Sequence, residues 1–91
     1  MWEVLFEPAA DAAMTALEQE PSAAALVHRL NAALRALAMS PGDARFRRRS
    51  YAPVGHMWGF LVRWRDDDRL LIWKYGPNDG QLTIRYIGPD L

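Results

Sequence analysis

The first forty residues carry one strand-like pattern and two helix-like patterns. Trp2, Val4 and Phe6 recur at every second position, which predicts a short strand over residues 2–6. Pro8 suits the first turn of a helix, because the N–H that proline lacks is not needed there. The next apolar residues recur at helical spacing, at Ala10, Ala13, Met14 and Leu17. The pattern therefore predicts a strand followed directly by an amphipathic helix.

A second helix is predicted immediately after the first. Glu20-Pro21 ends the first helix, because a residue before proline avoids helical dihedral angles. Ser22 is expected to cap the second helix. The apolar face of that helix consists of Leu26, Leu30, Ala33, Leu34 and Leu37. Ser40-Pro41-Gly42-Asp43 ends it, and the short linker between the helices predicts an antiparallel hairpin.

From Arg45 onward the apolar positions follow the period of a strand. Residues 45–51 are expected to form one strand, followed by a loop over 52–56. The clearest strand places four apolar residues on one face: Trp58, Phe60, Val62 and Trp64. Two more strands are predicted over 69–73 and 82–87. The turns before them are Asp66-Asp67-Asp68 and Gly76-Pro77-Asn78-Asp79-Gly80. Such short turns favour an antiparallel meander.

The order β-α-α-β-β-β-β predicts a single α+β domain over residues 1–91. We expect a two-layer sandwich, with an antiparallel sheet and the helical hairpin on one face. The face toward the helices is expected to carry Trp58, Phe60, Val62, Trp64, Leu70, Ile72, Leu82 and Ile84. The other face is expected to display Arg63, Arg65, Arg69, Trp73, Thr83 and Arg85. Trp2 is assigned to the core with Trp58 and Trp64, whereas the phase of Trp73 predicts an exposed ring.

The net charge is zero, but the charges are unevenly distributed. Residues 1–41 contain two arginines against five carboxylates, and residues 66–91 contain three cations against five carboxylates. Residues 42–65 contain six arginines and only one carboxylate, that of Asp43. Ten of the eleven cations are arginines, whose planar guanidinium can bind two oxygens of a phosphate or carboxylate at once. The middle segment therefore suits a local contact with phosphate or with an acidic protein.

Composition excludes several classes of protein. The chain has no cysteine, which excludes disulfide scaffolds, zinc–cysteine sites and thiol nucleophiles. We expect no metal and no cofactor, because the two histidines are far apart and no glycine-rich nucleotide motif is present. No apolar run reaches the roughly 18 residues of a membrane helix, and no basic leader opens the chain. A cytoplasmic location is expected.

Three kinds of side chain are candidates for chemistry. The run Arg45-Phe46-Arg47-Arg48-Arg49 suits phosphate or carboxylate binding, or alternatively a charged edge strand that prevents aggregation. An exposed Trp73 could stack on a nucleic-acid base. His56 is a candidate general acid or base, because an imidazole titrates near neutral pH.

Features along the whole chain resemble the RelE/ParE family, the toxins of bacterial type II toxin–antitoxin systems. They are the opening Val4-Leu5-Phe6-Glu7-Pro8-Ala9-Ala10, the helical hairpin, the arginine-rich stretch ending at Tyr51, the strand Asp68-Arg69-Leu70-Leu71-Ile72 and the closing Tyr86-Ile87-Gly88. The resemblance implies a bacterial toxin neutralised by a cognate antitoxin that wraps its surface. In the RelE branch the toxin cleaves mRNA in the ribosomal A site without a metal, and in the ParE branch the target is DNA gyrase.

The resemblance assigns roles residue by residue. Arg69 matches the phosphate-binding arginine of the RelE-like nucleases. The chain departs from these nucleases at Gly59 and Leu61, where they carry lysines, and at Pro89 and Asp90, where they carry basic residues. The candidate catalytic residues are Arg69, His56 and Arg85. The candidate phosphate- or RNA-binding residues are Arg45, Arg47, Arg48, Arg49, Arg63, Arg65 and Trp73.

Three functions remain open from the sequence. The first is a ribosome-dependent mRNA endonuclease, an mRNA interferase in which the ribosome, mRNA and an antitoxin are the partners. The second is a non-enzymatic toxin that inhibits DNA gyrase by binding. The third is an inactive homologue that keeps only antitoxin binding.

Overall fold

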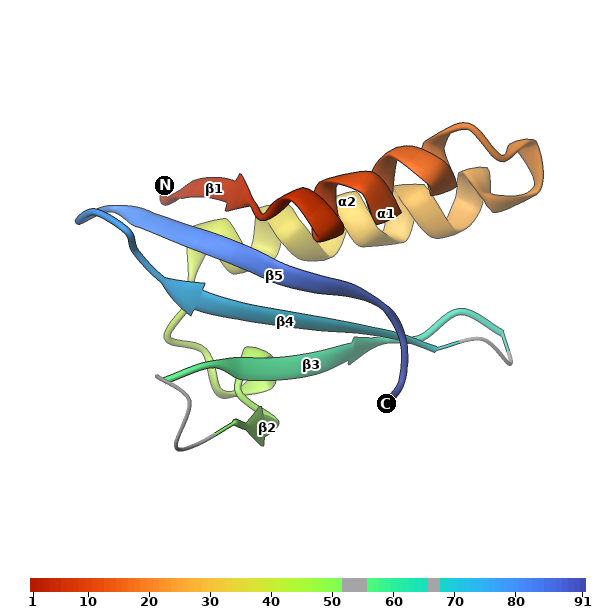
Figure 1. Cartoon of the computed structure of the whole chain (residues 1–91). Helices are drawn as coiled ribbons and strands as arrows, with labels where there is room; N and C mark the ends of the chain where they lie inside the picture. The colour runs from red at the N-terminus through yellow and green to blue at the C-terminus, as the bar shows by residue number, and fades with distance from the viewer. Residues whose placement is uncertain (52–55, 66–67) are drawn as a thin grey trace.

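The chain folds into a sheet and a helical hairpin packed in two layers (Figure 1). The computed structural model describes residues 1–51, 56–65 and 68–91. Residues 52–55 of the loop predicted over 52–56 lie outside these ranges, and so do the predicted turn residues Asp66 and Asp67. The described elements are β1 (Glu3–Phe6), α1 (Pro8–Glu18), the 3₁₀ turn η1 (Pro21–Ala23), α2 (Ala24–Met39), the 3₁₀ turn η2 (Ala44–Phe46), β2 (Arg49–Ser50), β3 (Trp58–Val62), β4 (Arg69–Tyr75) and β5 (Gln81–Pro89).

The described strands form one sheet in the order β1-β5-β4-β3-β2. Neighbouring strands are antiparallel except β1 and β5, which run parallel with Glu3 opposite Gln81. Both helices lie on the same face of the sheet (Figure 1). The predicted α+β two-layer sandwich is therefore confirmed. Among the described residues, no helix is both long enough and apolar enough to cross a membrane.

The helices follow the predicted patterns, with one difference at a cap. Pro8 lies in the first turn of α1, and α1 ends before Pro21. Ser22 was predicted to cap α2, but this prediction is wrong, because Ser22 lies inside η1. The carboxylate of Glu20 accepts hydrogen bonds from the Ser22 N–H (3.4 Å) and hydroxyl (3.0 Å). The four leucines of the predicted α2 stripe are buried, whereas Ala33 is only partly buried, and Ala38 is buried in addition.

Strand β3 faces the helices as its alternation predicts. Phe60 and Val62 are buried in the core, and Trp58 and Trp64 are partly buried against it. Cross-strand partners share a face of a sheet, so the register of β3 fixes the faces of β4. Trp58 is paired with Trp73, and Phe60 is paired with Leu71.

The predicted phase of β4 is wrong. Leu71 and Trp73 belong to the core under the helices, whereas Leu70 and Ile72 belong to the opposite face. Trp73 has an exposed fraction of 0%, so the prediction of an exposed ring for base stacking is wrong too. The cause is the run of four apolar residues from Leu70 to Trp73, because a continuous apolar run carries no period-2 signal.

A β-bulge changes the phase within β5. Ile72 is paired with Tyr86 and Trp73 with Ile84, so Arg85 is an extra residue on β5. After the bulge Ile87 faces the core, and Tyr86 faces away from the helices. The simple alternation expected over 82–87 is therefore correct only up to Ile84.

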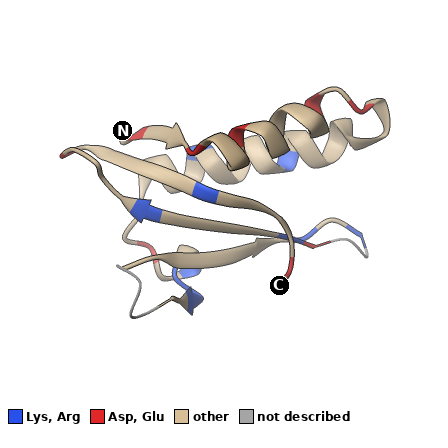
Figure 2. Ribbon diagram, viewed as in Figure 1, with Lys and Arg blue, Asp and Glu red and all other residues tan. Residues whose placement is uncertain are grey.

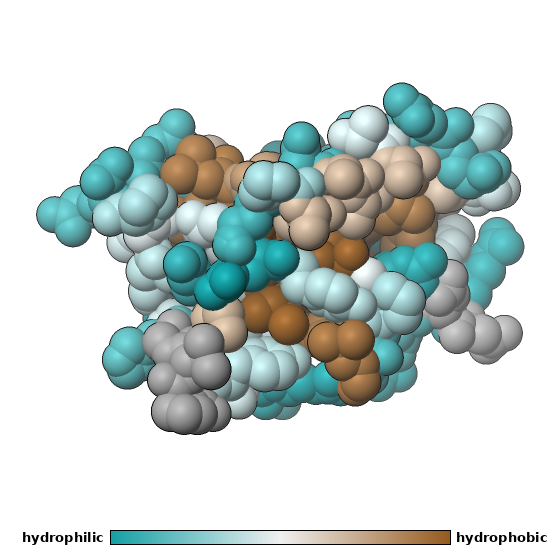
Figure 3. Space-filling model, in the orientation of Figure 1, coloured by the Kyte–Doolittle hydropathy of each residue, from teal (hydrophilic) through white to brown (hydrophobic). Residues whose placement is uncertain are grey.

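The sheet face away from the helices is covered by tyrosines. Leu70 on this face has an exposed fraction of 0%. The Tyr51 ring packs on Gly59 so closely that an added Cβ there would lie 2.9 Å from Tyr51 Cε2 and 3.3 Å from Leu70 Cδ1. Tyr86 packs in the same way on Gly88. In Figure 3 the apolar residues on the visible side of the molecule are interrupted by polar ones.

The arginine-rich segment is not the strand predicted over 45–51. Residues 44–46 form η2, and Asp43 is its N-cap. The Asp43 side chain accepts a 2.9 Å hydrogen bond from the Arg45 N–H. Strand β2 contains only Arg49 and Ser50. The backbone therefore turns within the arginine run and points its side chains in different directions.

We predict that Gly59→Ala destabilises the fold, because its Cβ would overlap the Tyr51 ring. The expected loss is about 1–3 kcal/mol in the free energy of unfolding, measured by urea titration. Gly42→Ala is the matched control, since no heavy atom lies within 4 Å of a Cβ at that position. A Gly59→Ala variant as stable as the parent would contradict the packing of Tyr51 described above.

Candidate functional site

The basic residues gather at the side of the molecule formed by η2, β2 and β3. Figure 2 shows acidic residues along α1 and the connection that follows it, and basic residues around β2 and the segment before it. Phe46 of η2 is buried and its ring packs edge-on against Phe60 of β3, with ring centroids 5.0 Å apart. This contact fixes η2 over the end of the core. The arginines on either side of Phe46 are thereby held at the surface.

The guanidinium of Arg47 packs against a cluster of aromatic rings. Its guanidinium carbon lies 4.5 Å from the centroid of the Trp58 ring and 5.6 Å from that of Tyr75. Its Nη2 donates a 2.6 Å hydrogen bond to the Tyr75 hydroxyl, and its Nε donates a 3.2 Å bond to the Pro41 carbonyl. A guanidinium over aromatic faces is stabilised by cation–π attraction. Arg47 therefore joins the segment after α2 to β3 and β4.

Arg49 forms a bidentate ion pair with Asp90. Arg49 Nη1 lies 2.5 Å from Asp90 Oδ1, and Nη2 lies 3.0 Å from Oδ2. The hydrogen bond to Arg49 lowers the pKa of the Asp90 carboxyl below its ordinary value, and the pair raises the pKa of Arg49. Asp90 thus provides a carboxylate for an arginine of this chain.

The three candidate catalytic residues are not brought together. His56 is exposed just before the start of β3, with a φ of 40°. Arg69 is paired with Val62 at the other end of β3, and at strand geometry these two ends are about 13 Å apart. Arg85 donates a 2.9 Å hydrogen bond from Nε to Glu7 Oε1, and its Nη1 lies 3.3 Å from Met57 Sδ. Arg85 is therefore near the His56 end of the sheet, and Arg69 is at the opposite end.

Arg63, Arg65, Arg69 and Arg85 were predicted to share the sheet face away from the helices, and this prediction is wrong for Arg69. Arg49 is opposite Gly59 and so belongs to the face away from the helices. Arg69 is opposite Val62, and Val62 faces the helices. Arg65 lies beyond the end of β3, where its guanidinium carbon is 5.0 Å from the centroid of the Trp64 ring.

Other arginines surround two adjoining cavities, which we name together the arginine groove. The larger cavity, of about 550 Å³, lies between α2 and β3, and the smaller, of about 420 Å³, lies beside the arginine run. The cavities share four lining residues, Arg45, Phe60, Leu61 and Arg63. Arg29 and three alanines of α2 line the larger cavity, and Arg48 and Arg49 line the smaller. In the part of the chain that the structure describes, no carboxylate lines either cavity.

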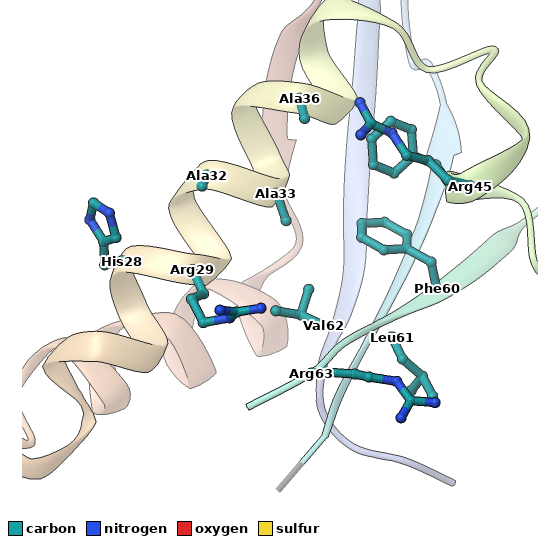
Figure 4. Close-up of a pocket in the computed structure, with 11 residues that line it drawn as sticks. His28, Arg29, Ala32, Ala33, Ala36, Arg45, Phe60, Leu61, Val62 and Arg63 are labelled. Atoms are coloured by element: carbon teal, nitrogen blue, oxygen red, sulfur yellow. The ribbon is translucent and has the colours of Figure 1, made fainter. Parts of the chain in front are cut away.

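The close-up of the larger cavity shows how its walls are built (Figure 4). Arg29 extends from α2 toward Val62, and Ala33 and Ala36 face β3 from the helix. These three α2 positions are spaced i, i+4 and i+7, which places them on one helix face. Sequence reasoning did not assign Arg29 to a site, although this spacing next to the apolar stripe was a usable signal.

The groove has the chemistry of an anion-binding surface and lacks groups for proton transfer. Arginine remains protonated and is a poor base. His28 is among the residues that line the larger cavity, but Figure 4 shows its imidazole ring pointing away from β3. Among residues 1–51, 56–65 and 68–91, no group of three His, Cys, Asp or Glu residues is placed to hold a metal ion.

We predict that Arg47→Lys lowers stability, because lysine cannot keep both hydrogen bonds and the stack on the rings. The expected loss is about 1–2 kcal/mol in a urea titration. Arg48→Lys serves as the control, since the Arg48 side chain is exposed and a surface substitution there should change stability by less than about 0.5 kcal/mol. Equal stability of the two variants would show that Arg47 is not a structural residue.

We also predict a pH-dependent effect of Asp90→Asn. The folded-state pKa of Asp90 is lowered, so its ion pair stabilises the fold above the unfolded-state pKa and is lost as the pH falls through the folded value. Asp90→Asn should therefore be less stable than the parent at pH 7 and equal to it near pH 2. Asp79→Asn, on an exposed turn, should match the parent at both pH values. Urea titrations at the two pH values measure this, and a difference that persists near pH 2 would contradict it.

Comparisons with known proteins add no relative: no protein-family model, no curated protein and no solved structure matches the chain.

Proposed function

We propose that this chain is a RelE/ParE-like toxin that acts by binding a protein target, as ParE does with gyrase, and is neutralised by a cognate antitoxin. The arginine groove is the observation that supports action by binding. Its cavities are lined by Arg45, Arg48 and Arg63, and no carboxylate of the described residues lines them. The order of the elements and the short segments quoted above support the family. A cytoplasmic location belongs to the same proposal.

The arrangement of the cations favours binding over RNA cleavage. A metal-free nuclease needs cations around one phosphate and a nearby group that moves the proton of the 2′-hydroxyl. Here Arg47, Arg49 and Arg85 are held by partners within the chain. The face on which such a nuclease would carry lysines is filled at Gly59 by the Tyr51 ring. A groove with arginines and no base is suited to holding an anionic partner.

One observation favours the nuclease as a second candidate. Arg85 contacts Met57, the residue that follows His56 in the chain, so an arginine and an imidazole lie at the same end of the sheet. This pair could stabilise charge and transfer a proton if the Arg85–Glu7 ion pair opened on RNA binding. In that mechanism His56 and Arg85 would act without Arg69.

The test is controlled expression in a bacterial host. We expect the parent chain to stop growth without cutting ribosome-bound mRNA, as read by primer extension. The Arg48→Glu, Arg63→Glu double variant should lose this toxicity, because it reverses two charges that line the groove. His56→Ala should remain toxic. Arg35→Glu is the matched control, since it reverses an exposed arginine of α2 that lies outside the groove.

Other outcomes would change the assignment. Growth arrest with mRNA cleavage that His56→Ala abolishes would support the nuclease and overturn the binding mechanism. A folded parent chain that leaves growth unaffected would overturn the toxin assignment. Inhibition of gyrase supercoiling by the purified chain would identify the target as the ParE-like one.

A further inference from the structure

The edge of β3 beside the arginine groove has no strand next to it along most of its length. Strand β2 pairs only with the start of β3, with Ser50 opposite Trp58 and Arg49 opposite Gly59. Before Arg49 the chain turns away into η2, which pairs with no strand. Within the described residues, β3 from Phe60 to Val62 is therefore an open sheet edge.

Backbone groups of Leu61 point out of this edge. The Met57 carbonyl accepts a 3.0 Å hydrogen bond from the Tyr51 N–H, so the backbone groups of Met57 point toward the β2 side. Alternate residues of a strand point their N–H and C=O to the same side, so Gly59 and Leu61 point there as well. Gly59 meets Arg49 of β2. The next position of this set, Leu61, is paired with Leu70 of β4 on the other side, but on the β2 side it has no strand partner in the described chain. An extended peptide could supply the missing hydrogen bonds.

The walls of the groove suit alternating side chains of such a peptide. The larger cavity has an apolar floor between α2 and β3, formed by Ala33, Ala36, Phe60 and Val62. Figure 4 shows this floor open between the helix and the strand, with Arg29 and Arg45 at its two ends. Because alternate residues of a strand point to opposite faces, one set of peptide side chains could fill the floor and the other could face the smaller cavity.

The charges around the groove suit an acidic partner. The described residues give no ion pair or hydrogen-bond partner to the side chains of Arg48 and Arg63. The Arg45 guanidinium lies 4.6 Å from the centroid of the Phe46 ring. The one carboxylate that it meets among the described residues is that of Asp43, at 3.5 Å, and both side chains of this pair are exposed. A guanidinium binds a carboxylate with two parallel hydrogen bonds, so glutamate and aspartate side chains match these positions.

The open edge decides between a peptide and a nucleic acid. Phosphates could satisfy the arginines, but a nucleic acid cannot continue the ladder of backbone hydrogen bonds at Leu61. We propose that an acidic segment of a partner protein binds the arginine groove in extended conformation and pairs with β3 as an added strand. This inference rests on the proposed function, and it identifies the surface that binds the partner. Added strands of this kind gain affinity from main-chain hydrogen bonds and specificity from side-chain pockets.

The test uses the purified chain and a fluorescein-labelled ten-residue peptide in which glutamate alternates with valine. We expect binding by fluorescence anisotropy that weakens as salt is raised, because charge pairs at the surface are screened. Hydrogen exchange at the Leu61 amide should slow about tenfold or more on binding, because the added strand protects it. A peptide with five glutamates followed by five valines should bind more weakly, since it lacks the alternation.

N-methylated peptides test the strand pairing directly. Alternate N–H groups of a strand point to opposite edges, so only one set can bond to β3. Methylation of one set, on all glutamates or on all valines, should weaken binding about tenfold or more, and methylation of the other set should leave it unchanged. Arg48→Glu with Arg63→Glu should weaken binding about tenfold or more, and Arg35→Glu should not.

Three results would overturn the inference. The first is the absence of peptide binding to the folded chain, which would leave the arginines as protection of an edge strand. The second is tight binding of a ten-nucleotide single-stranded RNA at Arg48 and Arg63 with no peptide binding. The third is a dimer of the chain, seen by sedimentation, that the double variant dissociates. Each is measured without a growth assay, so failure here is distinct from failure of the toxin assignment.

Discussion

The hydrogen bond from the Trp73 indole to the Phe46 carbonyl is the contact on which the rest of the structure depends. The ring is fully buried in the middle of β4, and a buried N–H is costly unless it is paired, so the chain after α2 must pass close to this strand. At 2.9 Å the bond holds Phe46 in the core and brings Arg47 over the rings beside it. With residues 44–47 held in this way, they cannot extend β2, and the edge of β3 is left open. The groove therefore follows from the way in which the buried Trp73 N–H obtains its hydrogen-bond partner.

Sequence patterns predicted the elements of this fold well where each pattern had a clear phase. The helical stripes and the alternation of β3 gave the correct faces. Polar or small residues lie between most of the apolar ones there, with Gly59 and Arg63 on either side of the run from Phe60 to Val62. The phase of β4 could not be read from Leu70 to Trp73, since both faces of that strand are buried and every residue is apolar. The bulge at Arg85 was equally hidden, because a bulge is defined by the partner strand and not by its own residues.

The candidate site shows a different limit of sequence reasoning. The sequence marks the arginine-rich middle segment as a candidate surface for anions, but it does not show the partners of individual arginines, which come from distant parts of the chain. Arg49 meets Asp90 and Arg85 meets Glu7, and nothing local to these arginines signals such pairs. What distinguishes Arg48 is the absence of a partner in the described structure, and that property exists only once the chain is folded.

The parallel pairing of β1 with β5 has a consequence for how the protein folds. Glu3 lies opposite Gln81 and accepts a hydrogen bond from its side chain, so this contact closes a loop of 78 residues. Contacts between residues so far apart in sequence form at a high entropic cost, and chains rich in them fold slowly. During synthesis β1 has no strand to pair with until β5 has left the ribosome, although it is made first. Trp2 and the β1 residue Phe6 then remain accessible until residues 81–89 have been made, which makes the growing chain a natural client for chaperones that bind apolar segments.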